Sequence, residues 1–313
     1  MAFKRFQNIF AESRFSLPFL MVVTVATWMF RGLLEDRLWM QFICLGMSTY
    51  LMIELNNANQ LLRVYSKMVS GSFLLLLIAA NPLFPSLRMS IIALCSVALY
   101  TMLFRCYQQK KSSGWVFYGF LCYGLASLVF PQIVFFIPFL WGSMAFNLYA
   151  LNAKTFFSSL LGLLTPYWFL FGYSVFSGNL SFWPEHVSQL SQFAPLFDYS
   201  GVSEHQLVTF GFVAICALIG IIHYMRNSFS DKIQTRMLFE VFILMDVMSL
   251  LFLVLQPQHY EPLMGMLIVN TAPLLAHFIT LTRTWLTNIA FYLILLLSFT
   301  IAAYHLWMPS LIF

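Results

Sequence analysis

Two neighbouring acids, Glu35 and Asp36, are the residues whose type and spacing most directly suggest chemistry. They lie in a short charged stretch, residues 31–37, between two long apolar runs. Two adjacent carboxylates in the densest charge cluster of the chain make Glu35 and Asp36 the candidate catalytic residues. The stretch is only a tight turn, so two solvated arginine–acid pairs at headgroup level are the simpler interpretation.

A second set of polar residues lies inside the apolar runs, where an ionisable group is costly unless it is paired or faces water. Asp246 stands near the middle of one run, level with Pro273 of the next, and Asn270 and Pro273 bracket a polar NTAP patch. Glu240 and His277 share a depth closer to the inner face. The set predicts a polar pocket or proton relay. Interhelical hydrogen bonds that lock the packing are the plainer alternative.

Two cations follow an amide-rich stretch. The sequence ELNNANQ begins at residue 54, and Arg63 and Lys67 come shortly after it. Amide and cationic side chains together suit a phosphate, so Arg63 and Lys67 are candidate contacts to lipid headgroups. A polar loop on the basic side of the membrane would need no such role.

The sequence predicts no metal and no cofactor. His186 beside Glu185, and His205 beside Glu204, lack the i, i+4 spacing of metal ligands on a helix. No phosphate-binding glycine loop, nucleophile elbow or nucleotide fingerprint occurs, which argues against an ATP-driven pump.

The composition indicates what kind of structure must position these residues. Of 313 residues, 61% are hydrophobic and only 9% are charged, whereas a soluble domain carries about 25% charged residues. Mean hydropathy is +0.82. A soluble fold could not hide this much apolar surface, so the chain is expected to be an all-α, multi-pass membrane protein. The basic residues are spread over short loops, so the net charge of +5 does not indicate a nucleic-acid partner.

The uncharged run at residues 115–148 sets the count of membrane crossings. It is too long for one crossing, which needs about 17–25 residues, and Pro131 marks a tight turn between two. Applied to the whole chain, the same reasoning predicts a single membrane domain, residues 1–313, with eleven crossings. These are residues 15–30, 38–54, 68–84, 89–103, 115–130, 131–148, 155–177, 207–225, 237–255, 262–281 and 286–306.

The distribution of basic residues gives this topology a direction. With the N-terminus inside, thirteen of the sixteen Lys and Arg residues fall on the inner side, and only Arg31, Arg37 and Arg88 fall outside. The C-terminus is then periplasmic. The largest outer loop, residues 178–206, contains Trp183 and Pro184 at a predicted helix start, and a short interfacial helix is expected there.

Two motifs carry a resemblance to a known family. The pattern G-x-A-S-L at residues 124–128, the turn at Pro131 and the pattern G-x-L-T-P-Y at residues 162–167 resemble a family of uncharacterised multi-pass inner-membrane proteins of Bacteroidota. Residues 54–68 resemble its second inner loop. The resemblance implies a location in the bacterial inner membrane and carries no activity. A weaker similarity links the hairpin-rich layout to envelope glycosyltransferases that use lipid-linked sugars. In those enzymes a carboxylate on the first outer loop acts as a base or binds a metal ion, and the similarity implies such a role for Glu35 and Asp36.

Three functions are compatible with these observations. The leading prediction is a role in assembling envelope glycans or lipid-linked precursors, with Glu35 and Asp36 at an outward-facing site and a lipid-linked sugar as partner. The first alternative is a secondary transporter or flippase that uses Asp246, Asn270 and His277. The second alternative is a membrane scaffold without chemistry. The sequence does not decide whether the protein is an enzyme.

Overall fold

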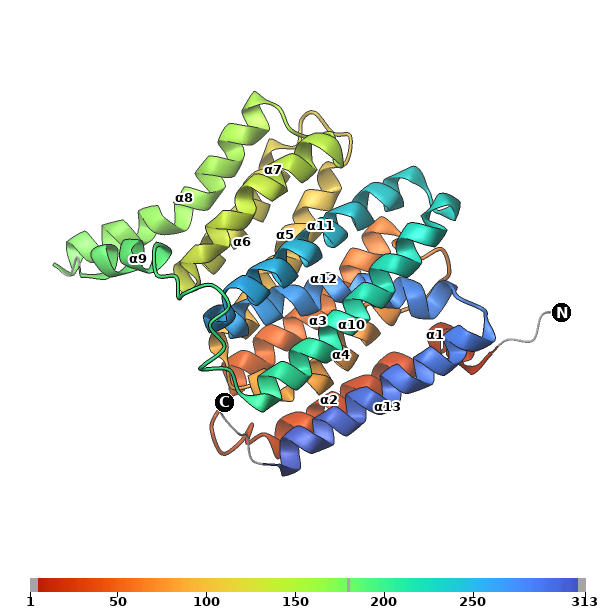
Figure 1. Ribbon diagram of the computed structural model, residues 1–313. Coiled ribbons are helices and arrows are strands. Elements are labelled where there is room, and N and C mark those ends of the chain that lie inside the picture. Colours follow the sequence, from red (N-terminus) through yellow and green to blue (C-terminus); the bar gives the residue numbers. More distant parts are fainter. Residues whose placement is uncertain (1–4, 179–180, 309–313) are drawn as a thin grey trace.

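The computed structural model describes residues 5–178 and 181–308, and within them every regular element is a helix (Figure 1). Residues 1–4, 179–180 and 309–313 lie outside the described residues. They include Lys4, part of the predicted outer loop and most of the predicted outer C-terminus. The α-helices are α1 (Phe6–Glu12), α2 (Ser16–Phe30), α3 (Trp39–Asn59), α4 (Met68–Ala79), α5 (Leu87–Leu103), α6 (Ser113–Val129), α7 (Ile137–Phe146), α8 (Ala153–Phe176), α9 (Phe182–Leu190), α10 (Glu204–Asn227), α11 (Ile233–Leu255), α12 (Tyr260–Leu281) and α13 (Trp285–Trp307). Short 3₁₀ helices are η1 (Asn81–Leu83), η2 (Phe104–Cys106), η3 (Pro131–Phe136), η4 (Ser228–Ser230) and η5 (Pro257–His259).

Each predicted crossing coincides with a helix, but the helices differ in their ability to span a bilayer. Among the described residues, six helices are long and apolar enough, and a seventh span is added if α1 and α2, bent by 85° at their junction, form one. Three predicted crossings fall on shorter apolar helices, namely α4, α6 and the η3–α7 pair. The structure therefore shows a helical protein with several helices that are long and apolar enough to span a membrane.

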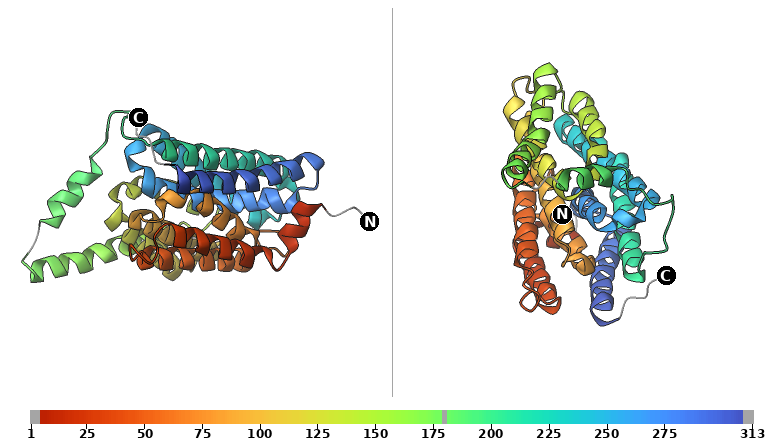
Figure 2. Two further views of the ribbon diagram at one scale, coloured as in Figure 1. Left: turned by 90° about the horizontal axis from the view of Figure 1, so that it is seen from below. Right: turned by 90° about the vertical axis from the view of Figure 1, so that its left-hand side faces the viewer.

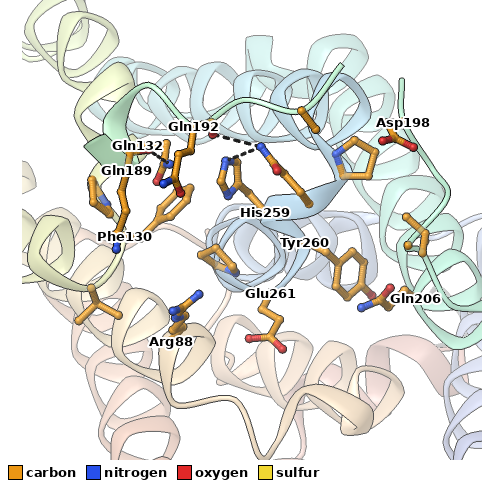
Figure 3. A pocket seen from close by; sticks show the side chains of 18 of the residues that line it. Arg88, Phe130, Gln132, Gln189, Gln192, Asp198, Gln206, His259, Tyr260 and Glu261 are labelled. Carbon is orange, nitrogen blue, oxygen red and sulfur yellow. Dashed lines mark hydrogen bonds between the residues drawn. The ribbon is translucent and has the colours of Figure 1, made fainter. Parts of the chain in front are cut away.

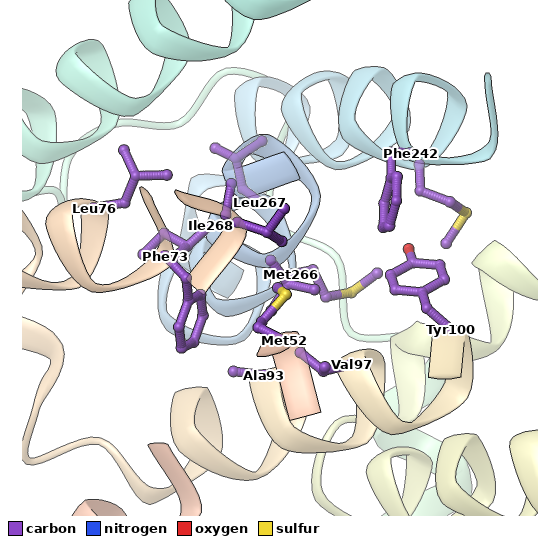
Figure 4. Close-up of a cluster of buried hydrophobic side chains, with 14 of the residues drawn as sticks. Met52, Phe73, Leu76, Ala93, Val97, Tyr100, Phe242, Met266, Leu267 and Ile268 are labelled. Carbon is purple, nitrogen blue, oxygen red and sulfur yellow. The ribbon is translucent and has the colours of Figure 1, made fainter. Parts of the chain in front are cut away.

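Helix α12 lies at the centre of the bundle. It is surrounded by α4, α5, α10 and α11 (Figure 1), and its most apolar 18-residue stretch is entirely buried. Close packing is possible because Gly265 faces the backbone of α5, where an added Cβ would lie 2.8 Å from the carbonyl oxygen of Met89. The buried core around it includes Met52, Phe73 and Val97 from three different helices (Figure 4).

The helices alternate in direction, which gives the bundle two ends. The first, here called the α1 end, carries α1 and the loops at residues 60–67, 147–152 and 228–232. The second, the cap end, is covered by residues 181–203, the cap, which includes α9. Helix α8 projects beyond the rest of the bundle, and the chain returns over the cap end from its tip (Figure 2).

The two motifs that carry the family resemblance meet in the contact between α6 and α8. An added Cβ at Gly124 would lie 2.6 Å from the carbonyl oxygen of Leu163, and one at Gly162 would overlap the carbonyl oxygen of Phe117. Small residues allow two membrane helices to approach this closely. The Tyr167 hydroxyl donates a hydrogen bond to Ser127 Oγ at 2.8 Å, which ties the second motif to the first.

Candidate functional site

A polar cavity of about 580 Å³ opens at the cap end (Figure 3). Its walls come from the start of α5, the turn between α6 and η3, the cap, and the start of α12. The lining residues are mostly polar: Arg88, Gln132, Gln189, Gln192, Asp198, Ser200, Gln206, Gln258, His259 and Glu261 are among them. A concave site with convergent polar groups is the usual form of a small-ligand site, so this cavity, the cap pocket, is the candidate functional site.

Glutamine side chains hold the cap over this pocket. Gln256, almost fully buried, accepts a hydrogen bond from the backbone N–H of Ala194 at 3.1 Å and donates one to its carbonyl oxygen at 3.0 Å. Gln132 donates to the carbonyl oxygen of Gln189 at 2.6 Å, and Gln258 donates to that of Gln192 at 3.2 Å (Figure 3). Uncharged side-chain amides thus hold the backbone of the cap in place by hydrogen bonds.

The charged groups of the pocket differ in their partners. The Glu261 carboxylate accepts a hydrogen bond from the Ser86 hydroxyl at 2.6 Å. Hydrogen bonds from the hydroxyl (2.6 Å) and backbone N–H (3.1 Å) of Ser200 lower the pKa of Asp198, so that it is ionised at neutral pH. Arg88 is exposed at the rim. A cation, two carboxylates and several amides together suit a ligand that carries both phosphate and hydroxyl groups.

An aromatic and imidazole cluster lies at the floor of the pocket and beside it. The His259 ring packs edge-on against Phe130, with ring centroids 5.3 Å apart, and also contacts Phe252. In the cap, His186 of α9 stacks on Phe182 and lies 3.0 Å from the hydroxyl of Tyr167 on α8. Burial lowers the pKa of His186, so its ring is neutral at pH 7. Helix α9 is therefore anchored by rings on α8.

The predicted catalytic pair, Glu35 and Asp36, lies elsewhere at the cap end. Both side chains are exposed in the turn between α2 and α3, and neither belongs to the lining of the cap pocket. The turn is folded on itself, with Gly32 at φ +82° and its carbonyl oxygen accepting from the backbone N–H of Asp36 at 2.8 Å.

The four residues of the predicted intramembrane site separate into three places. Asp246 is fully buried and accepts a hydrogen bond from Thr271 of α12 at 2.9 Å. Asn270, which precedes Thr271 in α12, accepts a hydrogen bond from the Tyr100 hydroxyl at 2.6 Å. Glu240 is exposed on the side of the bundle and accepts from Asn147 at 2.6 Å. The bond between Asp246 and Thr271 joins α11 to α12 in the buried interior of the bundle.

His277 belongs to a buried network at the α1 end. Its Nε2 lies 3.1 Å from one oxygen of Asp231, and Nε of Arg63 lies 2.6 Å from the other. The side chains of His277 and Asp231 have no exposed surface. The predicted headgroup contact Arg63 is thus ion-paired with a buried carboxylate, and its partner Asp231 was not singled out in the sequence. Lys67 lies at the N-cap of α4.

A second buried polar cluster at the cap end was also not predicted. Arg31 donates two hydrogen bonds to Asn81 Oδ1, at 2.8 and 2.6 Å, and one to the carbonyl oxygen of His305 at 2.9 Å. Burial lowers the pKa of Arg31. The ring of His305 lies against that of His205, with centroids 4.7 Å apart. The sequence signal was an arginine directly after an apolar run, which was interpreted as a solvated turn.

Within residues 5–178 and 181–308, no group of three or more His, Cys, Asp or Glu side chains could hold a metal ion. Comparisons of the chain with protein-family models, with curated proteins and with solved structures gave no match. The geometry of the cap pocket is therefore the observation from which a function is argued.

Proposed function

We propose that this chain is a protein of the bacterial inner membrane that crosses it eleven times, with the α1 end in the cytoplasm and the cap end outside. The proposal rests on the agreement of each predicted crossing with a helix and on the concentration of basic residues in loops of the α1 end. The short α4 fits because it is entirely buried among other helices and need not match the bilayer thickness by itself.

The proposed activity is the binding of a lipid-linked precursor of the envelope in the cap pocket, in the manner of enzymes that transfer sugars from lipid phosphates. The single observation that carries it is the polar cavity of about 580 Å³ at the end of a membrane bundle. A membrane-anchored substrate would place its phosphate and sugar at this depth while its chain stays in the bilayer.

Residues of the pocket suit the steps of such a transfer. Arg88 would balance the charge of the lipid phosphate that leaves the sugar. Glu261, oriented by Ser86, would take the proton of the acceptor hydroxyl that attacks the sugar carbon. These roles replace those expected for Glu35 and Asp36, because Arg88 and Glu261 line the cavity and the earlier pair does not.

The test compares two matched pairs of variants in the native host. Arg88→Gln and Glu261→Gln are each expected to lower the amount of surface glycan about tenfold or more, since a charge-assisted contact is lost. Arg37→Gln and Glu35→Gln remove the same charges at the same end, outside the pocket lining, and are expected to leave the glycan unchanged. Membrane levels of all four variants are measured by immunoblotting.

The opposite pattern decides against the proposal. A normal glycan profile in Arg88→Gln and Glu261→Gln, at normal protein levels, excludes the cap pocket as the site. Loss of glycan in Glu35→Gln alone would instead indicate that the active site lies at the turn between α2 and α3.

A further inference from the structure

A second cavity, of about 430 Å³, lies at the opposite end of the bundle. It is formed by the last turn of α3, the loop that follows it, and the first turn of α11. Its lining residues are Asn56, Asn57, Gln60, Leu62, Arg63, Val64, Tyr65, Ser66, Lys232 and Thr235. It shares no residue with the cap pocket and is called the α1-end pocket.

The positive charge in this pocket comes mainly from Lys232. Arg63 is already paired with the buried carboxylate of Asp231, whereas the Lys232 ammonium donates to the neutral Gln60 Oε1 at 2.9 Å. An ammonium group has three donors, so two remain for a ligand. Lys232 is also the N-cap of α11, a 23-residue helix whose first turn contains neither a capping side chain nor an acid. The helix end therefore adds to the positive potential.

An unpartnered acceptor lies in the same wall. Asn56 is about nine-tenths buried, its Nδ2 donates to the carbonyl oxygen of Ser66 at 2.9 Å, and its Oδ1 has no hydrogen-bond partner among the described residues. A buried acceptor without a partner is unfavourable unless a ligand supplies a donor. Tyr65, another residue of the lining, is 77% exposed, as is common for tyrosine at the membrane–water interface.

We infer that the α1-end pocket binds a phosphate-bearing lipid headgroup that also carries a hydroxyl or ammonium donor. Lys232 and the N-terminus of α11 contact the phosphate, and the donor of the headgroup satisfies Asn56. The site lies at the α1 end, away from the proposed site of transfer, and its ligand is a component of the surrounding bilayer. The inference does not depend on the activity of the cap pocket.

The experiment measures retention of phosphatidylglycerol by the purified full-length protein in detergent, with native mass spectrometry as the readout. The role of the donor is measured by comparing phosphatidylethanolamine with phosphatidylcholine, because both are without net charge and only the first has a headgroup N–H donor. Lys232→Gln is expected to lower the retention of phosphatidylglycerol about fivefold, as is usual for one basic residue at an anionic lipid surface. Lys154→Gln, the matched control, removes a lysine of the same end that does not line the pocket.

Each other outcome overturns the inference. Equal losses in Lys232→Gln and Lys154→Gln would indicate a general effect of surface charge. Equal retention of phosphatidylethanolamine and phosphatidylcholine by the unmodified protein would exclude the role of the donor. Displacement of the lipid by inorganic phosphate would assign the site to a free anion. Gln60→Ala, which leaves the charge in place, is expected to weaken retention less than Lys232→Gln.

Discussion

Two arginines at the α1 end show how little an exposed fraction says about the importance of a charge. The Arg63 and Arg105 side chains are 38% and 37% exposed, but their partners differ: Asp231 has no exposed surface and Glu54 is 43% exposed. The distances differ in the same direction, 2.6 Å for the first pair and 3.8 Å for the second. Removal of Arg63 leaves a buried carboxylate, whereas removal of Arg105 leaves a solvated one.

Arg63→Ala is therefore expected to lower the free energy of unfolding by about 2–3 kcal/mol, somewhat less than for a pair with both partners buried, because Arg63 still reaches water. Arg105→Ala should change it by about 1 kcal/mol or less. The measurement is the temperature at which the protein in detergent loses its monodisperse size-exclusion peak. Similar shifts for both variants would contradict the structural importance of the Asp231 network.

Sequence reasoning at the residue scale identified polar residues that are unusual for their location but not their partners. Asp246, Asn270 and His277 were singled out because ionisable and amide groups are rare inside apolar runs, and all three are buried and hydrogen-bonded. Asp231 was missed because a single acid in a basic loop is ordinary by composition. Only the fold of the loop, which turns the carboxylate inward, makes it exceptional.

At the scale of elements, the contact between α6 and α8 explains what the resemblance motifs do. Gly124 and Gly162 permit backbone contact, and Tyr167 hydrogen-bonds to Ser127. The residues of both motifs therefore have a structural role, because they hold α6 and α8 together.

Gly162→Ala is expected to separate α6 from α8 or to strain both, because its Cβ would overlap the Phe117 carbonyl. Overpacking of this kind typically costs about 1–3 kcal/mol. Gly172→Ala on the same helix has no atom within 4 Å of the new Cβ, and should be neutral or slightly stabilising because Ala favours the helix. The thermal stability of the two variants is measured in detergent. Equal stability would contradict the importance of the close glycine contact between α6 and α8.

Hydropathy predicted where helices lie but could not predict which helix is central. The most apolar 18-residue stretch of α12 is completely buried although its mean hydropathy is 1.6. The corresponding stretch of α11 reaches 2.5, and only 44% of it is buried. Inside a membrane the lipid is as apolar as the protein core, so burial leaves no excess of apolar residues. The cap pocket could not be predicted from the sequence, because its walls come from segments that are far apart in the chain.

For the whole molecule, the proposed orientation has a direct test. Alkaline phosphatase fused after Phe313 is expected to be active and green fluorescent protein at the same position dark, because the C-terminus is proposed to be periplasmic. Fusions after Lys154 should give the reverse, since this loop is at the α1 end. A fluorescent C-terminal fusion would contradict an odd number of crossings.

The central position of α12 also has a consequence for the order in which the chain is made. Helices leave the ribosome from the N-terminus onward, yet α12 follows in the chain all four of the helices that surround it, α4, α5, α10 and α11. Until residues 257–281 have been synthesised, the earlier helices therefore lie in the bilayer without the helix that their inner faces contact in the folded protein. During this interval α4, all of whose residues are buried in the finished protein, lacks its main neighbour. Nascent chains that end before α12 should therefore be the forms that membrane proteases recognise and remove.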